Sequence, residues 1–178
     1  MKLSENAKEW IKDLGIAVVC AVVLLQFIQP TIVREHSMEN TLIENDYLFV
    51  SKQTYKLFGK EPATGDIIVF KSDLTTATGQ NKLLIKRIIG VGGDTIAIHG
   101  GVVYLNGEAL DESYTKDGYT NTEMDETYIP AGCVFAMGDN RQNSADSRDS
   151  RIGCVDEDLI LGKAVVRIFP FNKFGGLY

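Results

Sequence analysis

The run Leu83-Leu84-Ile85-Lys86-Arg87-Ile88-Ile89 places two basic residues inside a stretch of aliphatic side chains. Its short length and its β-branched residues predict a β-strand in the core of a folded domain. A lysine in such a strand loses water unless its side chain snorkels to the edge of the sheet. The first question for the fold is therefore whether the side chain of Lys86 is buried or reaches solvent.

Similar short runs recur along the chain on both sides of this one. They cover residues 47–50, 66–70, 95–98, 102–105, 134–137 and 163–169. His99-Gly100-Gly101 and Asn106-Gly107 predict tight hairpin turns between neighbouring strands. The pattern predicts a mainly β fold with sequential antiparallel hairpins. A short helical turn is expected over 157–161, and the acidic stretch 111–127 is interpreted as a solvated surface loop.

Residues 14–33 form an uncharged apolar segment near the N-terminus. As a helix it would be about 30 Å long, which matches the hydrocarbon core of a bilayer. Trp10, Lys12 and Arg34 are candidate interfacial anchors, while Gln29 and Pro30 indicate that the far end can unwind. A cleavable signal peptide is the alternative, but no small-x-small cleavage pattern follows the segment. We therefore expect an uncleaved transmembrane helix over 14–33.

The chain is thus divided into an N-terminal segment (1–13), a transmembrane helix (14–33) and one β domain (34–178). Lysines precede the helix, and few basic residues follow it closely. This asymmetry favours a cytoplasmic N-terminus and an extracytoplasmic domain. We expect a single-pass protein of the plasma membrane, with the lipid bilayer as one partner.

Composition argues against several classes of function. The net charge is −6, and neither a basic stripe nor a nucleic-acid motif is present, so no nucleic-acid partner is expected. Cys20, Cys133 and Cys154 lack the spacing of a metal site, so neither a metal nor another cofactor is expected. Cys133 and Cys154 are interpreted as structural residues, and a disulfide between them is the alternative in an oxidising compartment.

The stretch Arg34-Glu35-His36-Ser37-Met38-Glu39-Asn40-Thr41-Leu42 contains a candidate nucleophile, Ser37. Taken alone, Ser37 is more typical of a turn residue. A Ser-His-Asp triad is not expected, because His36 points away from Ser37 in an extended chain and His99 lies in a hairpin turn. Lys86 can act as the base instead, if burial lowers its pKa from the usual value of about 10.4. A lysine that snorkels to the surface is the alternative.

Four blocks of sequence occur in a recognisable order: SMENTL (37–42), GDIIVF (65–70), KRIIGVGGD (86–94) and GDNRQNSADSR (138–148). This order resembles the type I signal peptidases, membrane-anchored Ser/Lys proteases that cut signal peptides from exported proteins. The single span is similar to that of Gram-positive members. The resemblance implies an antiparallel β domain of the signal-peptidase type. It also implies serine endopeptidase activity on the signal peptides of exported preproteins, with cleavage after small residues.

The resemblance also implies roles for individual residues. Ser37 is expected to be the nucleophile, Lys86 the general base, and Ser144 a hydrogen-bond partner of the lysine. The residues expected to brace the site are Asp139, Asp146, Arg148 and Arg87, with Arg87 paired to Asp139. The substrate is expected to lie as an added strand between the segments leading to Ser37 and to Lys86. The candidate walls of its apolar pockets are Val33, Met38, Val69 and Ile85.

Two positions depart from the family pattern, and three alternatives follow. Asn40 replaces a proline after the nucleophile, and Glu35 replaces a small residue next to the oxyanion hole; we expect Glu35 to face solvent. A catalytically weak or inactive relative that assembles surface proteins is one alternative, although Ser37, Lys86 and Ser144 are retained. A self-cleaving repressor is another, but the chain has a membrane span where such proteins bind DNA. A membrane-anchored binding domain is the third.

Overall fold

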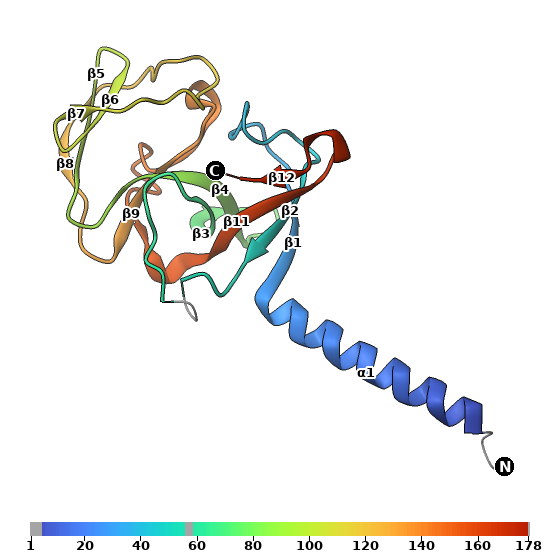
Figure 1. Cartoon of the computed structure of the whole chain (residues 1–178). Coiled ribbons are helices and arrows are strands. Elements are labelled where there is room, and N and C mark those ends of the chain that lie inside the picture. The colour runs from blue at the N-terminus through green and yellow to red at the C-terminus, as the bar shows by residue number, and fades with distance from the viewer. Residues whose placement is uncertain (1–4, 56–58, 178) are drawn as a thin grey trace.

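The computed structural model describes residues 5–55 and 59–177, and it consists of one N-terminal helix and a mainly antiparallel β domain (Figure 1). The predicted fold class is therefore confirmed. Helix α1 (Glu5–Phe27) projects away from the β domain, and its apolar side chains are exposed. Lys8–Phe27 is long and apolar enough to cross a membrane. Residues 1–4 of the predicted cytoplasmic segment lie outside the described residues.

The helix ends six residues before the predicted boundary at Val33. Ile28–Ile32 forms strand β1, which pairs antiparallel with β2 (Tyr47–Ser51), from Ile28 opposite Ser51 to Ile32 opposite Tyr47. The expected helix over 14–33 is therefore wrong in its last residues. Pro30 explains this end, because proline cannot donate an intrahelical hydrogen bond but is tolerated in a strand at the edge of a sheet.

The larger sheet has the strand order β1-β2-β11-β3-β4-β9-β10, and β12 pairs with β11. The further strands of this sheet are β3 (Ile67–Thr75), β4 (Asn81–Val91), β9 (Cys133–Met137), β10 (Val155–Asp156), β11 (Ile160–Phe169) and β12 (Gly175–Gly176). The smaller sheet has the order β7-β6-β5-β8. Its strands are β5 (Thr95–His99), β6 (Val102–Leu105), β7 (Glu108–Ala109) and β8 (Met124–Tyr128). Every run predicted as a strand overlaps one of these strands.

Short connections complete the domain. Gly100, Gly101 and Gly107 have positive φ angles, as the predicted hairpin turns require. The expected helical turn is the 3-10 helix η2 (Glu157–Leu159), and two others are η1 (Arg141–Asn143) and η3 (Phe171–Lys173).

The acidic stretch 111–127 is largely exposed, as predicted for a surface loop, but it is not a loop throughout and parts of it are buried. Its last residues belong to β8, and Thr115 and Thr120 are buried. Glu112 is also largely buried, because it pairs with Arg141. The stretch covers the loop that follows β9.

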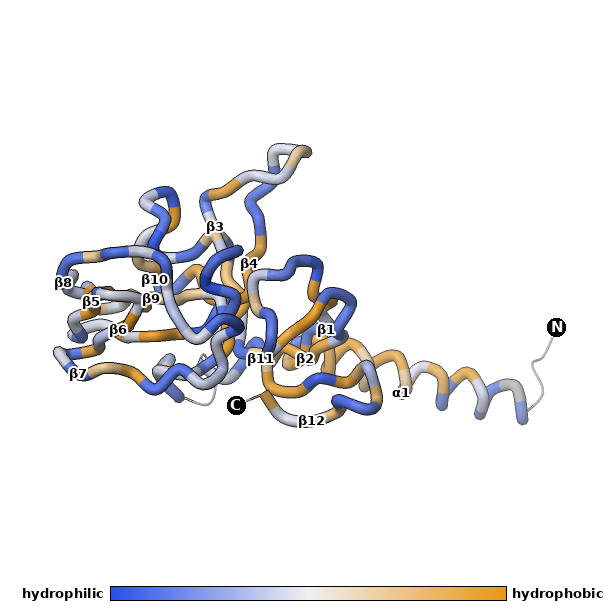
Figure 2. The backbone as a smooth tube through the Cα atoms, turned by 90° about the horizontal axis from the view of Figure 1, so that it is seen from above, coloured by the Kyte–Doolittle hydropathy of each residue, from blue (hydrophilic) through white to orange (hydrophobic). Residues whose placement is uncertain are grey.

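Residues of high hydropathy are concentrated in the part of α1 next to β1 and in the strands of the β domain (Figure 2). One core cluster lies around the loop that carries Ser37 and includes Met38, Leu42, Val50 and Ile67. Cys133 and Cys154 are free thiols that pack against a second cluster, so the alternative of a disulfide is not realised in this structure.

Candidate active site

Ser37 lies in a closed loop between β1 and β2. Two backbone hydrogen bonds close the loop: Val33 N donates to Asp46 O, and Asn45 N donates to Val33 O, both at 2.9 Å. Met38, directly after the serine, is 1% exposed and fastens the loop to the core. Asn140 holds the other side of the loop. Its backbone N donates to Ser37 O and its side-chain Nδ2 donates to His36 O, both at 3.0 Å. These contacts fix the backbone on both sides of the hydroxyl.

Lys86 lies on β4 opposite Ile68 of β3, and it is 1% exposed. Its Nζ donates to Ser37 Oγ at 2.7 Å and to Ile85 O at 3.0 Å. Burial lowers the pKa of Lys86 to about 8, although the nearby carboxylates of Asp146 and Glu35 act in the opposite direction. The structure thus brings together the two side chains that the sequence singled out, and the lysine does not snorkel.

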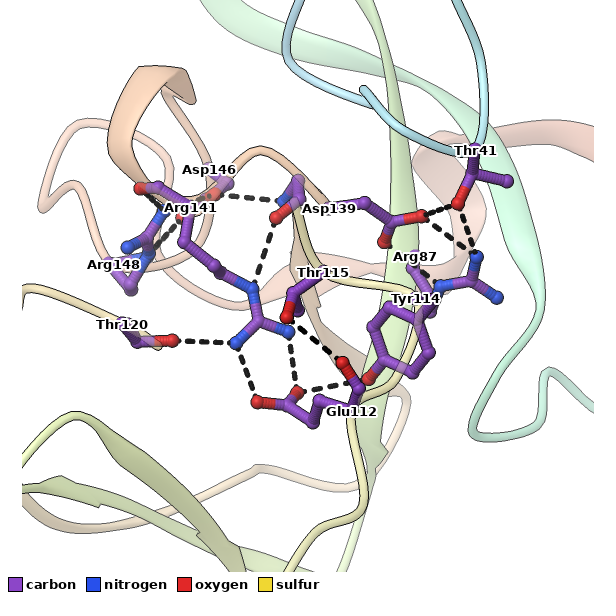
Figure 3. Close-up of polar contacts among 11 residues, drawn as sticks. Thr41, Arg87, Glu112, Tyr114, Thr115, Thr120, Asp139, Arg141, Asp146 and Arg148 are labelled. Atoms are coloured by element: carbon purple, nitrogen blue, oxygen red, sulfur yellow. Dashed lines mark hydrogen bonds and ion pairs between the residues drawn. The ribbon is translucent and has the colours of Figure 1, made fainter. Parts of the chain in front are cut away.

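Arg87, the next residue on β4, makes the expected ion pair with Asp139. Its Nε donates to Oδ1 at 2.9 Å and its Nη2 to Oδ2 at 2.8 Å, and both side chains are almost fully buried. Thr41 Oγ1 donates to the same carboxylate at 2.5 Å, and the guanidinium lies 4.2 Å from the centroid of the Tyr114 ring (Figure 3). The pair connects β4, the Ser37 loop and the segment after β9.

Asp139→Ala is expected to lower the free energy of unfolding by about 3–5 kcal/mol, because it removes the buried carboxylate that forms an ion pair with Arg87. Chemical denaturation of the purified protein measures this change. The control is Asp149→Ala, which breaks the exposed pair between Asp149 and Arg151 and should leave the unfolding free energy nearly unchanged. Equal effects of the two substitutions would contradict a bracing role for Asp139.

Asp146 and Arg148 also lie at the site, as expected. Arg148 donates to both carboxylate oxygens of Asp146 at 2.8 Å, and Gly138 N donates to Asp146 Oδ2 at 2.9 Å. Burial raises the pKa of Asp146, but the hydrogen bond and charge of Arg148 outweigh this and keep it below its usual value. Asp146 is therefore a fixed negative charge near Lys86.

Ser144 does not make the hydrogen bond to Lys86 that the resemblance implies. Its Oγ is buried and forms no well-aligned hydrogen bond in the described part of the chain, although it lies close enough to Asp146 to lower the pKa of that carboxyl. It packs against Gly138, where a Cβ would lie 2.2 Å from Ser144 Oγ and 2.4 Å from Ser37 O. Ser144 is thus near Ser37 but makes no hydrogen bond to Lys86.

Two buried arginines, Arg141 and Arg167, also stabilise the site, and the sequence analysis did not predict this role for either of them. Arg141 donates to Glu112 Oε2 at 2.8 Å, to Thr120 Oγ1 at 2.7 Å and to Gly138 O at 3.1 Å (Figure 3). Arg167 donates to Thr41 O at 2.6 Å. Arg141 lies within the GDNRQNSADSR block, which was the only signal for its role. Arg167 carried no signal, because its partner is far away in the sequence.

A groove of about 330 Å³ leads to Ser37. One wall consists of β1 and the residues after it, and the other is the first half of β4. Both bordering strands have free edges here, since β1 ends the sheet and β4 pairs with β9 only from Arg87 to Val91. The predicted pocket residues Val33, Met38, Val69 and Ile85 all line the groove. Residues 5–55 and 59–177 contain no group of three or more His, Cys, Asp or Glu residues that could hold a metal ion.

Comparisons with known proteins agree on one family. The family described as signal peptidase, peptidase S26, matches residues 7–169. The signal peptidase I of Leptolyngbya laminosa is 38% identical over 99% of this chain and 86% of its own length. That of Bacillus licheniformis is 34% identical over 93% of this chain and 90% of its own. A crystal structure of a signal peptidase I from Enterococcus faecalis covers 58% of this chain and 97% of its own, at 28% identity and a TM-score of 0.47.

The chain therefore belongs to the signal peptidase family, peptidase S26, whose members are serine endopeptidases. Its activity is that of signal peptidase I, the cleavage of signal peptides from exported proteins. The apolar N-terminal helix is consistent with the single-pass membrane anchor of such an enzyme.

Proposed function

We propose that Ser37 is the nucleophile and Lys86 the general base of this signal peptidase. The observation that carries the proposal is the contact of 2.7 Å between Lys86 Nζ and Ser37 Oγ, made by a lysine that is 1% exposed. An amine this close to the hydroxyl can exchange a proton with it directly. The lowered pKa of Lys86, about 8, makes about one amine in ten neutral at pH 7.

The reaction then proceeds in two stages. Neutral Lys86 accepts the Ser37 proton while Oγ attacks the carbonyl carbon of the scissile peptide bond, and the proton passes to the departing amine as the bond breaks. In the second stage Lys86 takes a proton from water, which attacks the acyl-enzyme and releases Ser37. The same lysine therefore serves acylation and deacylation.

The backbone N–H of Ser37 is available to stabilise the oxyanion. In the described part of the chain it donates to no other group, so it can point a hydrogen bond at the developing charge. The carboxylate of Glu35, two residues earlier, is ion-paired with Lys82. The positive charge of Lys82 therefore compensates the carboxylate, which reduces its repulsion of the oxyanion.

The substrate binds as an extended strand between the free edges of β1 and β4. Backbone groups on both walls can pair with it, as in other cases of strand addition. Val33, Met38 and Val69, each at most 3% exposed, form the apolar floor of the groove. This floor favours small side chains at the first and third positions before the cut, because alternate residues of a strand face the same side.

The enzyme acts at the plasma membrane with α1 as its anchor. The N-terminus is cytoplasmic and the β domain extracytoplasmic, which is the side on which signal peptides of exported preproteins emerge. The exposed apolar side chains of α1 support its role as an anchor, and the lysines near its start support this orientation. The bilayer is thus a partner of the helix.

A pH series tests the dyad. We expect kcat/KM for a peptide without titrating groups to rise about fiftyfold from pH 6 to pH 8 and to level off above pH 9, because only neutral Lys86 is active. His36→Gln is the control, since it removes the imidazole that is next to Ser37 in the chain. A flat profile in the wild type, or one that His36→Gln abolishes, would contradict Lys86 as the base.

A further inference from the structure

An ion pair joins the two walls of the substrate groove. Glu35 lies on the segment between β1 and Ser37, Lys82 lies on β4, and Glu35 Oε1 contacts Lys82 Nζ. Both residues line the groove. Their side chains are 43% and 39% exposed, whereas Val33 and Val69 on the floor are each 3% exposed. The pair therefore lies on the solvent side of the groove, opposite the apolar floor.

The position of Glu35 along the groove follows from its place in the chain. Glu35 comes two residues before Ser37, in the bend that follows β1, and Lys82 comes four residues before Lys86 on β4, which is about 13 Å at about 3.3 Å per residue of strand. A substrate strand whose scissile carbonyl is at Ser37 has its second residue before the cut closest to Glu35. If its first and third side chains face the floor, its second side chain points to the solvent side.

We propose that Glu35 and Lys82 determine specificity by responding to the charge of this second, outward-facing substrate residue, with a preference for a cation. The inference rests on the proposed function, because it takes Ser37 as the point of cleavage. A substrate lysine there replaces Lys82 as the partner of Glu35, and Lys82 turns to solvent. A substrate glutamate instead meets Glu35 as a like charge, while Lys82 approaches from about two residues farther along β4.

The effect should be modest, because both side chains are partly exposed and the pair is screened by water. Partly exposed ion pairs contribute little, so the expected preference for lysine over glutamate is about fivefold in kcat/KM. The preference should diminish in 1 M salt, where the Debye length is about 3 Å.

The experiment uses the full chain in detergent and peptides that differ only in lysine, glutamine or glutamate at the second position before the cut. The wild type should cleave the lysine peptide about five times faster than the glutamate peptide. In the charge-swapped double variant, Glu35→Lys with Lys82→Glu, this ratio should invert. The ratio compares two substrates of one enzyme at one pH, so a change in the pKa of Lys86 cancels.

The control reverses a pair that does not line the groove, through Asp149→Lys with Arg151→Glu, and should keep the wild-type ratio. A wild-type ratio near one, or an unchanged ratio in the Glu35/Lys82 swap, would overturn the inference. Ser37→Ala separates this outcome from a failure of the proposed function. If that variant cleaves none of the peptides, the dyad stands and only the specificity role is lost; if it cleaves them at wild-type rates, the dyad itself is wrong.

Discussion

Replacing Ser37 with alanine is expected to lower kcat/KM for a preprotein by at least about a thousandfold, because the variant lacks the oxygen that forms the acyl-enzyme. The fold should persist, since the contact of the hydroxyl is with Lys86 and the backbone of the loop is fastened independently by Met38 and Asn140. Cleavage assays and thermal unfolding of the same preparation measure the two quantities together.

The exposed serine Ser150 provides the matched control, because Ser150→Ala removes the same atom away from the groove. It should cleave at the wild-type rate. Rapid cleavage by Ser37→Ala would place the nucleophile elsewhere. The absence of cleavage by the wild type would instead support the alternative of an inactive relative.

Lys86→Met should abolish cleavage to a similar degree and yet stabilise the fold at pH 7. The pKa of Lys86 is lowered by burial from 10.5 to about 8, so the folded protein bears a buried charge at a cost of about 3 kcal/mol. Methionine fills a similar volume without that charge. The lost hydrogen bonds to Ser37 and Ile85 offset part of the gain, so about 3 kcal/mol is its upper limit.

The sign of the pH dependence distinguishes this explanation from simple repacking. Between pH 8 and pH 10.5 the unfolded wild type binds more protons than the folded form, so its stability rises with pH across this window. Below pH 8 the full penalty is present. The advantage of Lys86→Met should therefore be greatest at pH 7 and should shrink as the pH approaches 10.5.

Lys163→Met is the control for this second substitution, because the Lys163 ammonium is paired with Asp66 and partly exposed. Its removal should produce no gain in stability. Denaturant unfolding at pH 7 and at pH 10 measures all three proteins. If the Lys86→Met variant were less stable than wild type at pH 7, the buried charge of Lys86 would not destabilise the fold as expected.

Local sequence patterns were sufficient for most of the strands, whereas Ser37 and Lys86 were chosen as candidates with the help of the order of the motifs. Short β-branched runs identify strands because their periodicity is local, and glycine pairs identify turns because only particular φ angles fit them. Lys86 could be chosen because its neighbours in the chain are aliphatic. Its partner Ser37 was chosen from the order of the motifs, not from any calculation of distance.

Contacts between distant parts of the chain decided the rest. Pro30 indicated that the apolar segment could unwind at its far end, but only the pairing of Ile28–Ile32 with β2 shows that the helix stops at Phe27. Glu112 leaves solvent because Arg141 is buried beneath it. Such pairings join residues 15 to 29 positions apart and depend on which strands become neighbours.

The sequence by itself therefore determined the class of fold and the presence of an apolar N-terminal helix, and it singled out Ser37 and Lys86 as the candidate pair. Only the tertiary structure decided that these two side chains are in contact, that Ser144 is not bonded to the lysine and that Glu35 reaches Lys82 across the groove. The physical reason is that hydrophobic periodicity reports which residues are buried, whereas hydrogen bonds and ion pairs depend on the register between strands.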